Sequence, residues 1–203
     1  MPAHEPQNFR DKYEKSGLIG GWLIDRFYAS IGGLVAGLQP PPANAFEVGA
    51  GEGFSTLRLA PMLPADCRFV SSEFEPELAQ RARQRNPGVA ISTQSIYALE
   101  QADASADLVV CLEVLEHLDD PARGLAELAR VTRGHLIVSV PNEPLWRVLN
   151  CARGKYWSDL GNTPGHLNHW TPWAFERFIA TRCDVVARLQ PLPWTIVLAV
   201  PRR

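Results

Sequence analysis

Short apolar runs alternate with amphipathic helical patterns through much of this chain, and this alternation restricts its possible folds more than any other feature. In the helical patterns, apolar residues recur on one face, as Leu125, Leu128 and Val131 do. Strands that alternate with helices form parallel βαβ units with right-handed crossovers. The sequence therefore predicts an α/β fold with a Rossmann-like, doubly wound sheet. The apolar runs predicted to be strands are 45–48, 67–74, 89–96, 107–114 and 135–140.

The remaining parts of the chain complete this prediction. Residues 1–44 form a predicted N-terminal helical segment that ends at a run of prolines, and residues 45–203 form the core. Apolar runs near 184–189 and 194–200 are expected to add an antiparallel C-terminal hairpin to a seven-stranded, mostly parallel sheet. A length of 203 residues with 46% hydrophobic content favours a single domain.

Residues 141–170 interrupt the alternation with Pro, Asn, Gly and aromatic residues. A long irregular segment between regular elements is usually functional. We predict that it forms a mobile lid over the active site. Its aromatic side chains are candidates for the wall of an apolar or aromatic acceptor site: Trp146, Tyr156, Trp157 and Trp170.

Charge and cysteine content exclude some classes of protein. A net charge of -2 and a pI near 6.2 give no electrostatic footprint for nucleic acid. Four cysteines without a CxxC pair fit a reducing cytoplasm, and residues 1–10 lack a signal-peptide pattern. The apolar stretch 18–38 is interrupted by Asp25 and Arg26, which favours a helix packed on the domain over a transmembrane segment. We predict a cytoplasmic location and a small-molecule partner, with the oligomeric state left open.

A glycine-rich loop, residues 47–53, separates the first predicted strand from the first helix. Glycines let the backbone approach a ligand closely, and the following helix offers free amides. Glu47 lies two residues before the first glycine, where a carboxylate suits a cationic ligand better than a pyrophosphate. Glu73 ends the second predicted strand, where its carboxylate can accept hydrogen bonds from both ribose hydroxyls.

This loop, Glu73 and the run 107–117 resemble class I S-adenosylmethionine-dependent methyltransferases, and among them the ubiquinone-biosynthesis O-methyltransferase branch. The resemblance covers about residues 45 to 203, is strongest up to Asn142, and implies S-adenosylmethionine as the cofactor. The residues that it implies for the cofactor site are Tyr13, Glu47, Gly49, Ala50, Gly51, Gly53, Glu73, Phe74, Ser95, Ile96 and Cys111.

The resemblance also implies a role for several of these residues. Gly49 and Gly51 line the methionine part of the cofactor, and Tyr13 caps it. Phe74 lies against the adenine, whose edge Ser95 borders together with Ile96. Many relatives carry Asp where Ser95 stands, which weakens the expected contact with the adenine amino group.

The stretch after the fourth predicted strand indicates the reaction. An Asp/Asn-Pro-Pro-Tyr/Phe signature, which resembles that of enzymes methylating amide or amino nitrogen, is absent. Glu113, Glu116 and His117 share one face if a helical turn follows the strand, and His169 is expected to join them. These residues are similar to the metal-binding pattern of small-RNA 2′-O-methyltransferases. We predict O-methylation of a small-molecule hydroxyl, with these four residues as catalytic groups and as ligands of Mg²⁺, Mn²⁺ or Zn²⁺, and His166 as the spare ligand.

Other interpretations stay open at this stage. Glu116 and His117 could serve structure alone, through hydrogen bonds to loop backbone and to each other. Methylation of nitrogen or carbon by positioning alone needs no metal. A non-catalytic, cofactor-binding regulatory partner would bind the cofactor without turnover. A nicotinamide-dependent reductase is disfavoured because no Tyr-x-x-x-Lys occurs.

Overall fold

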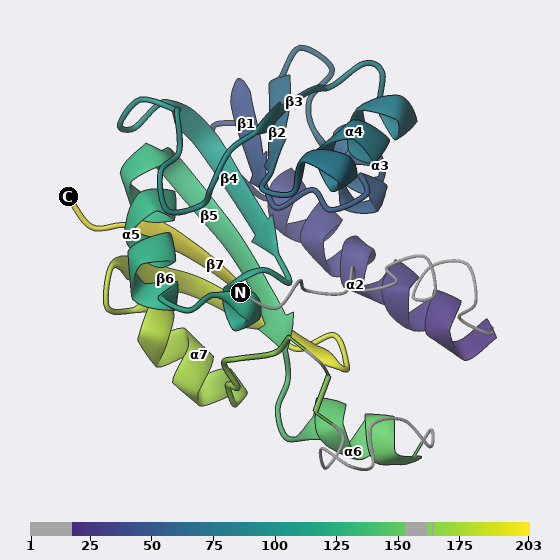
Figure 1. Ribbon diagram of the computed structural model, residues 1–203. Coiled ribbons are helices and arrows are strands. Elements are labelled where there is room, and N and C mark those ends of the chain that lie inside the picture. The colour runs from purple at the N-terminus through teal and green to yellow at the C-terminus, as the bar shows by residue number, and fades with distance from the viewer. Residues whose placement is uncertain (1–17, 153–161, 164) are drawn as a thin grey trace.

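The computed structural model describes residues 18–152, 162–163 and 165–203, and Figure 1 shows their arrangement. The elements are α2 (Leu18–Ala36), β1 (Asn44–Val48), α3 (Phe54–Leu59), η1 (Ala60–Met62), β2 (Arg68–Glu73), α4 (Pro76–Arg85), β3 (Ala90–Thr93), β4 (Ala106–Leu112), η2 (Leu115–His117), α5 (Pro121–Val131), β5 (Thr132–Pro141), α6 (Leu145–Ala152), α7 (Pro172–Ile179), β6 (Cys183–Leu189) and β7 (Trp194–Pro201). From α2 to β5 strands and helices alternate as predicted, except that β4 follows β3 without a helix between them, and α6, α7 and two strands come after β5.

The strands form a 7-stranded sheet in the order β3-β2-β1-β4-β5-β7-β6. The pairings from β3 through β5 are parallel. Strand β7 is antiparallel to both of its neighbours and lies between β5 and β6. The predicted Rossmann-like, doubly wound sheet with an antiparallel C-terminal hairpin is therefore confirmed.

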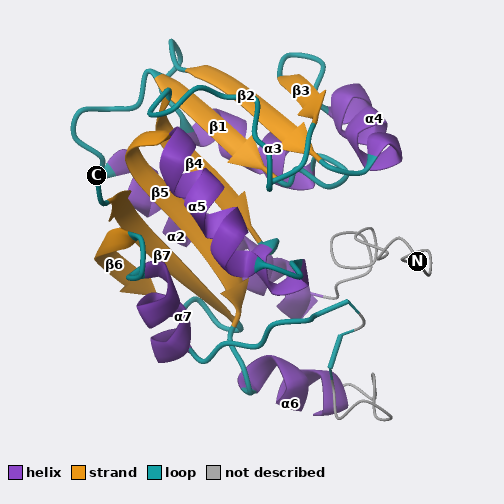
Figure 2. Ribbon diagram, turned by 60° about the vertical axis from the view of Figure 1, so that its left-hand side comes forward, coloured by secondary structure: helices purple, strands orange, loops and turns teal. Residues whose placement is uncertain are grey.

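Helices cover both faces of the sheet, and Figure 2 shows α5 and α7 in front of the strands with α2 behind them. Alternate residues of the central strand β4 enter opposite cores, because side chains of a strand point to opposite faces in turn. Val109 packs with α5 and α7, whereas Leu108 and Val110 pack with α2 and α3. Each face is thus apolar, as a parallel sheet covered on both sides requires.

Helix α2 is packed on the domain, as its apolar spacing predicted. Its buried side chains include Phe27 and Ile31, which belong to one core cluster with Trp194 of β7. Along the chain that the structure describes, no helix combines the length and the apolar character needed to cross a membrane.

Short polar residues and prolines set the starts of two helices. Asp120 precedes Pro121 of α5, and its side chain accepts a hydrogen bond from the Arg123 amide at 3.0 Å. Thr171 precedes Pro172 of α7 and caps that helix in the same way. A side-chain oxygen at this position satisfies an amide that the first turn leaves without a partner. A capping residue followed by proline thus begins each of the two helices.

The lid segment, residues 141–170, differs from the prediction because it contains helix α6. This helix lies beyond the tip of β5 (Figure 1). Its apolar spacing is short and is flanked by prolines and asparagines, so the sequence did not indicate a helix here. Within the helix, Trp146 is buried and Val148 is exposed. The segment is therefore not irregular throughout.

Candidate active site

The predicted functional residues lie where the strand order reverses. Strand β1 pairs with β2 on one side and with β4 on the other. In open α/β sheets, a crevice forms at this point beyond the carboxyl ends of the strands. The glycine-rich loop follows β1, Glu73 ends β2, and η2 follows β4. These segments supply the candidate site.

The carboxylate of Glu73 connects the end of β2 to the glycine-rich loop. Its Oε2 accepts a hydrogen bond from the Gly51 amide at 2.7 Å, and its Oε1 accepts one from the Glu75 amide at 3.0 Å. The amides of Gly49 and Ala50 donate to the carbonyl of Ser72, each at 2.9 Å. A carboxylate has room for about four hydrogen bonds, so Glu73 keeps acceptor capacity for ribose hydroxyls.

Different surroundings explain the presence of glycine at the three positions of this loop. At Gly49, with φ of 86°, an added Cβ would lie 2.3 Å from Cγ2 of Val114. At Gly53, an added Cβ would lie 2.8 Å from Cα of Ala82 on α4. At Gly51, an added Cβ would meet open space. Gly49 and Gly53 are therefore required by contacts within the protein, whereas Gly51 borders the space that a ligand could occupy.

Glu47 does not lie where the sequence argument expected it. The side chain is 1% exposed, and its Oε2 accepts hydrogen bonds from Thr56 at 2.5 Å and Ser71 at 2.8 Å. Burial raises the pKa of this carboxyl, and hydrogen bonds from Ser55, Thr56 and Ser71 oppose that effect. The carboxylate thus joins α3 to β2 inside the protein. This placement does not support a direct contact with a cationic ligand.

Cys111 likewise faces the interior. Its side chain is 0% exposed within the core cluster that includes Val109 and Val138, and burial raises the pKa of its thiol well above the usual value. The side chain is therefore enclosed by the core, and a place for Cys111 in the cofactor site remains a prediction. The buried Ala50 side chain packs with Ala82.

The predicted adenine residues lie on the other side of Glu73. Phe74 is 63% exposed, so its ring is free of the core and available for stacking. Ser95 accepts a hydrogen bond from the Tyr97 amide at 3.2 Å, and Ile96 is buried against Gly124 of α5. Tyr13 lies outside the described residues.

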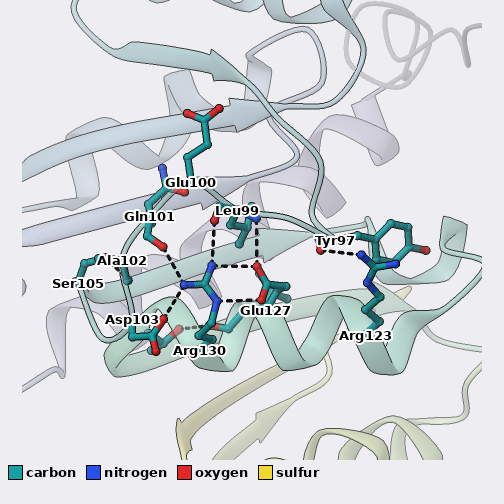
Figure 3. Close-up of polar contacts among 12 residues, drawn as sticks. Tyr97, Leu99, Glu100, Gln101, Ala102, Asp103, Ser105, Arg123, Glu127 and Arg130 are labelled. Carbon is teal, nitrogen blue, oxygen red and sulfur yellow. Dashed lines mark hydrogen bonds and ion pairs between the residues drawn. The ribbon is translucent and has the colours of Figure 1, made fainter.

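A polar network fixes the connection between β3 and β4, which carries Ser95 and Ile96 (Figure 3). The guanidinium of Arg130 on α5 makes two hydrogen bonds to Glu127, each at 2.8 Å. It also donates to the carbonyls of Leu99 and Gln101, each at 2.9 Å, and to Asp103 at 2.7 Å. Helix α5 thereby holds this connection against the sheet. The connection includes Ser95 and Ile96, which are predicted to border the adenine.

The turn after β4 is not the regular helical turn that the spacing assumed. Glu113 has a φ of 57°, a left-handed backbone conformation that is costly for residues other than glycine. Its Oε1 accepts a hydrogen bond from Ser139 of β5 at 2.9 Å. The 3₁₀ turn η2 begins only at Leu115. Glu113 therefore faces β5 and does not share one helical face with Glu116 and His117.

The structure instead brings Glu116 and His117 together with His166, the residue named as the spare ligand. One ligand atom from each lies within 4.8 Å of the others, the only such group of three or more potential metal ligands among the described residues. Glu116 is 1% exposed and His166 is 5% exposed. The ring centres of His117 and His166 are 4.9 Å apart, in an edge-on arrangement. Nδ1 of His117 lies 2.8 Å from the carbonyl oxygen of Gly165.

His169 lies outside this group. Its Nε2 is 2.7 Å from Oδ1 of Asn162, and burial together with the charge of Arg147 lowers its pKa. The structure therefore does not bring together the predicted set of Glu113, Glu116, His117 and His169, and the residues that it does bring together are Glu116, His117 and His166.

Two of the predicted wall aromatics serve packing. Trp146 is 9% exposed, and its indole donates a hydrogen bond to Thr163 at 2.9 Å. Trp170 stacks on Phe178 of α7, with ring centres 5.3 Å apart. The structure gives neither residue the exposed ring that an acceptor wall needs. Tyr156 and Trp157 lie outside the described residues.

Sequence reasoning missed two polar residues of this site. Ser139 on β5 binds Glu113, and Asn168 donates to the carbonyls of Leu118 and Leu115 around η2. Ser139 is a single polar residue within the apolar run 136–140 of a buried strand, which was a usable signal for a buried polar partner. Asn168 lies in a segment without periodicity, so no signal indicated its direction.

Comparisons with known proteins support the cofactor class. Residues 46–138 match a family model described as a methyltransferase domain. A protein of Mycobacterium tuberculosis, described as a probable S-adenosylmethionine-dependent methyltransferase, is 35% identical over 101 residues, which are 49% of this chain and 36% of that protein. The malonyl-[acyl-carrier protein] O-methyltransferase of Hahella chejuensis is 33% identical over 102 residues, 48% of this chain and 36% of that enzyme. The matches thus span little more than a third of each of these two relatives.

A solved structure agrees over almost the whole chain. The magnesium protoporphyrin IX methyltransferase of Synechocystis PCC 6803 with bound SAH (S-adenosylhomocysteine) has a TM-score of 0.69 and 16% identity, covering 97% of this chain and 96% of that one. At this identity the likeness shows the fold. Together with the family match, the comparisons support the predicted enzyme class, a class I S-adenosylmethionine-dependent methyltransferase, and its cofactor. The ubiquinone-biosynthesis branch remains a prediction.

Proposed function

We propose that this chain transfers the methyl group of S-adenosylmethionine to a hydroxyl group of a small molecule. One observation carries the proposal: two sets of polar groups lie beyond the carboxyl ends of adjacent strands. Glu73 with the Gly51 loop forms one set, and Glu116, His117 and His166 form the other. The first set suits a nucleoside cofactor, and the second suits the removal of a proton from an acceptor.

The residues around Glu73 would bind the cofactor in a fixed orientation. Glu73 is 8% exposed and already ordered by two backbone amides, so little side-chain freedom is lost when ribose hydroxyls bind. The exposed ring of Phe74 follows Glu73 directly and would stack on the adenine. Methyl transfer from a sulfonium is an in-line displacement in which charge disperses, so alignment and proximity supply much of the rate enhancement.

The acceptor half of the site fits a divalent cation. One carboxylate and two imidazoles form a donor set that Mn²⁺ and Zn²⁺ accept readily, and Mg²⁺ less so. Glu116, His117 and His166 would hold the ion, which when bound lowers the pKa of a hydroxyl ligand. The partial burial of the cluster would exclude much of the water that competes with the acceptor.

Without a metal, the same cluster would act as a general base. The contact of Nδ1 of His117 with the Gly165 carbonyl favours the tautomer in which Nδ1 carries the proton. Nε2, which lies 3.9 Å from Oε1 of Glu116, would then accept the proton of the acceptor. Methylation of nitrogen or carbon by positioning alone, and a non-catalytic regulatory role, remain the rival functions.

The cofactor part of the proposal is tested by calorimetry with S-adenosylhomocysteine. Glu73→Ala removes the ribose acceptor and the bond to the Gly51 amide, so affinity should fall by about 2 kcal/mol or more. Glu75→Ala is the matched control, because the hydrogen bond to Glu73 comes from the Glu75 backbone and survives the substitution. Equal affinity of all three proteins would sink the placement of the cofactor.

The acceptor part is tested by turnover on a panel of phenols and sugars, with and without a chelator. Glu116→Ala and His166→Ala should abolish metal-stimulated turnover and leave cofactor affinity unchanged. His169→Ala should retain activity, because its ring faces Asn162. Full activity under chelation together with its loss in His117→Ala would replace the metal with a general base. Cofactor binding without turnover on any acceptor would favour the regulatory role.

A further inference from the structure

The described residues between 162 and 170 form a strap that lies along η2. The amides of Leu167 and Asn168 both donate to the carbonyl oxygen of Glu116, at 2.8 and 2.9 Å. The side-chain amide of Asn168 donates to the carbonyls of Leu118 at 2.7 Å and of Leu115 at 3.4 Å. Asn168 therefore contacts the carbonyls of three of the four residues from 115 to 118.

These contacts matter because η2 is too short to hold itself in place. It has three residues, and its internal bonds include the His117 amide to the Val114 carbonyl at 3.0 Å and the Leu118 amide to the Leu115 carbonyl at 3.3 Å. A single 3₁₀ turn leaves most of its carbonyls without helical partners. The direction of the Glu116 and His117 side chains thus depends on the donors that the strap supplies.

The strap also carries His166 and is fixed at its other end. The hydroxyl of Thr163 accepts hydrogen bonds from Trp146 at 2.9 Å and from Asn150 at 3.2 Å, both on α6. The His166 amide donates to the Thr163 carbonyl at 3.1 Å. His166 is therefore held between the anchor at Thr163 and the clamp at Asn168.

We propose that Asn168 is a positioning residue, which fixes Glu116 and His117 at the spacing from His166 that a divalent cation requires. The inference rests on the proposed function of this cluster. An amide suits the role because it offers two N–H donors, whereas a carboxylate of the same shape offers none and would face two carbonyl oxygens. Partners of this kind orient the ligands of metal sites.

The test uses the full chain and Co²⁺ as a spectroscopic probe. Asn168→Asp should weaken Co²⁺ binding about tenfold or more and change the visible spectrum of the bound ion, because the ligand geometry is loosened. S-adenosylhomocysteine affinity should stay within about twofold of wild type, because Glu73 and its loop lie on other strands. Asn162→Asp is the matched control on the same strap, since its side chain contacts His169.

Each outcome decides the proposal. Wild-type Co²⁺ affinity in both Asn168→Asp and Asn168→Ala would overturn it, and the alanine variant alone decides if the aspartate variant does not fold. A wild-type chain that binds no Co²⁺ would remove the metal from the proposed function. That result would also overturn the role proposed for Asn168, whereas weaker Co²⁺ binding by Asn168→Asp and Asn168→Ala than by wild type, with unchanged S-adenosylhomocysteine affinity, supports it.

Discussion

Glu47 and Glu73 are carboxylates on adjacent strands with opposite surroundings. Glu47 is enclosed by hydroxyl groups of α3 and β2, whereas Glu73 lies at the strand end and binds backbone amides of the glycine-rich loop. Strand position explains the difference, because Glu47 points into the layer between sheet and helix and Glu73 reaches the crevice at the sheet edge. One carboxylate supports the loop from inside, and the other is placed to bind a ligand.

The first residue-scale prediction concerns Gly49. Gly49→Ala should lower the free energy of unfolding by more than about 2 kcal/mol, because it combines a positive φ with an overlap with Val114. The same substitution in a Val114→Ala background should cost less, since the overlapping methyl group is gone. Gly51→Ala, with φ of 55° but open space at Cβ, should cost only about 1 kcal/mol. Urea denaturation of these variants measures the coupling, and additive effects would contradict the contact.

The second residue-scale prediction concerns pH and Glu47. Its pKa is raised in the folded state above the ordinary value of 4.5, so the neutral form is favoured there. The resulting stability is fully present below pH 4.5 and is lost as pH rises through the raised pKa. Glu47→Gln has no ionisable proton, so its free energy of unfolding relative to wild type should increase as pH rises above 4.5. A difference that stays constant over this range in urea denaturation would refute the assignment.

The residue scale also shows where sequence reasoning about the site stops. The glycine-rich loop after β1 and the acidic residue at the end of β2 could be located from the sequence, because each directly follows or ends an apolar run, whereas their roles toward the cofactor remain predictions. The choice between His166 and His169 could not be made in advance, because an irregular segment has no period from which a side-chain direction follows. Glu113 was misplaced because helical spacing was assumed where the backbone takes a left-handed φ.

At the scale of elements, the helices hold the loops that form the site. Helix α5 fixes the β3–β4 connection through Arg130, and α6 fixes the strap through Thr163. A capping residue followed by proline marks the start of α5 and of α7 in the sequence. Helix α6 was missed because its eight residues lie between proline-rich and glycine-rich stretches, where a short apolar spacing is hard to recognise.

The prediction for α5 concerns Arg130 (Figure 3). Arg130→Met should lower the free energy of unfolding by about 1–3 kcal/mol, since it leaves the partly buried Glu127 carboxylate without its guanidinium. Amide exchange should accelerate in residues 97–105. Arg123→Met is the milder control, because that guanidinium only bonds the Tyr97 carbonyl at 3.3 Å and stacks over its ring. Equal losses in both variants would show that the network does not anchor the connection.

The prediction for the lid segment concerns ligand-dependent motion. Peptides from residues 141–152 and 165–170 should exchange amide hydrogens more slowly when cofactor and acceptor are both bound, because closure would exclude water from the reaction. The cofactor alone should protect mainly the glycine-rich loop. Equal protection with and without ligands would identify the segment as ordinary structure.

At the scale of the whole molecule, one hydrophobic core lies on each face of the sheet. The cluster with α5 and α7 and the cluster with α2 and α3 take alternate side chains from the same strands. Alternating patterns along the chain predicted this architecture together with the antiparallel hairpin. They left the order of the two hairpin strands open, although β7 is apolar nearly throughout and therefore fits the inner position better than β6, which carries Asp184 and Arg188.

A whole-molecule prediction follows from cofactor binding to the folded state alone. S-adenosylhomocysteine at one hundred times its dissociation constant should add about 2.7 kcal/mol to the free energy of unfolding and raise Tm accordingly. The rise should disappear in Glu73→Ala at the same concentration. Scanning fluorimetry measures it, and NADH serves as the control ligand. A similar shift with NADH would argue against selectivity for the sulfonium cofactor.

The place of β7 has a consequence for how the chain acquires its structure during synthesis. Strand β7 pairs with both β5 and β6, so two of the sheet's six pairings wait for residues 194–201. Until those residues leave the ribosome, β5 presents an unpaired apolar edge that could associate with other chains. We therefore expect a nascent chain ending before Trp194 to engage chaperones and to be digested readily by protease. The pairing of β5 with β6 through β7 is therefore expected only after residues 194–201 are available.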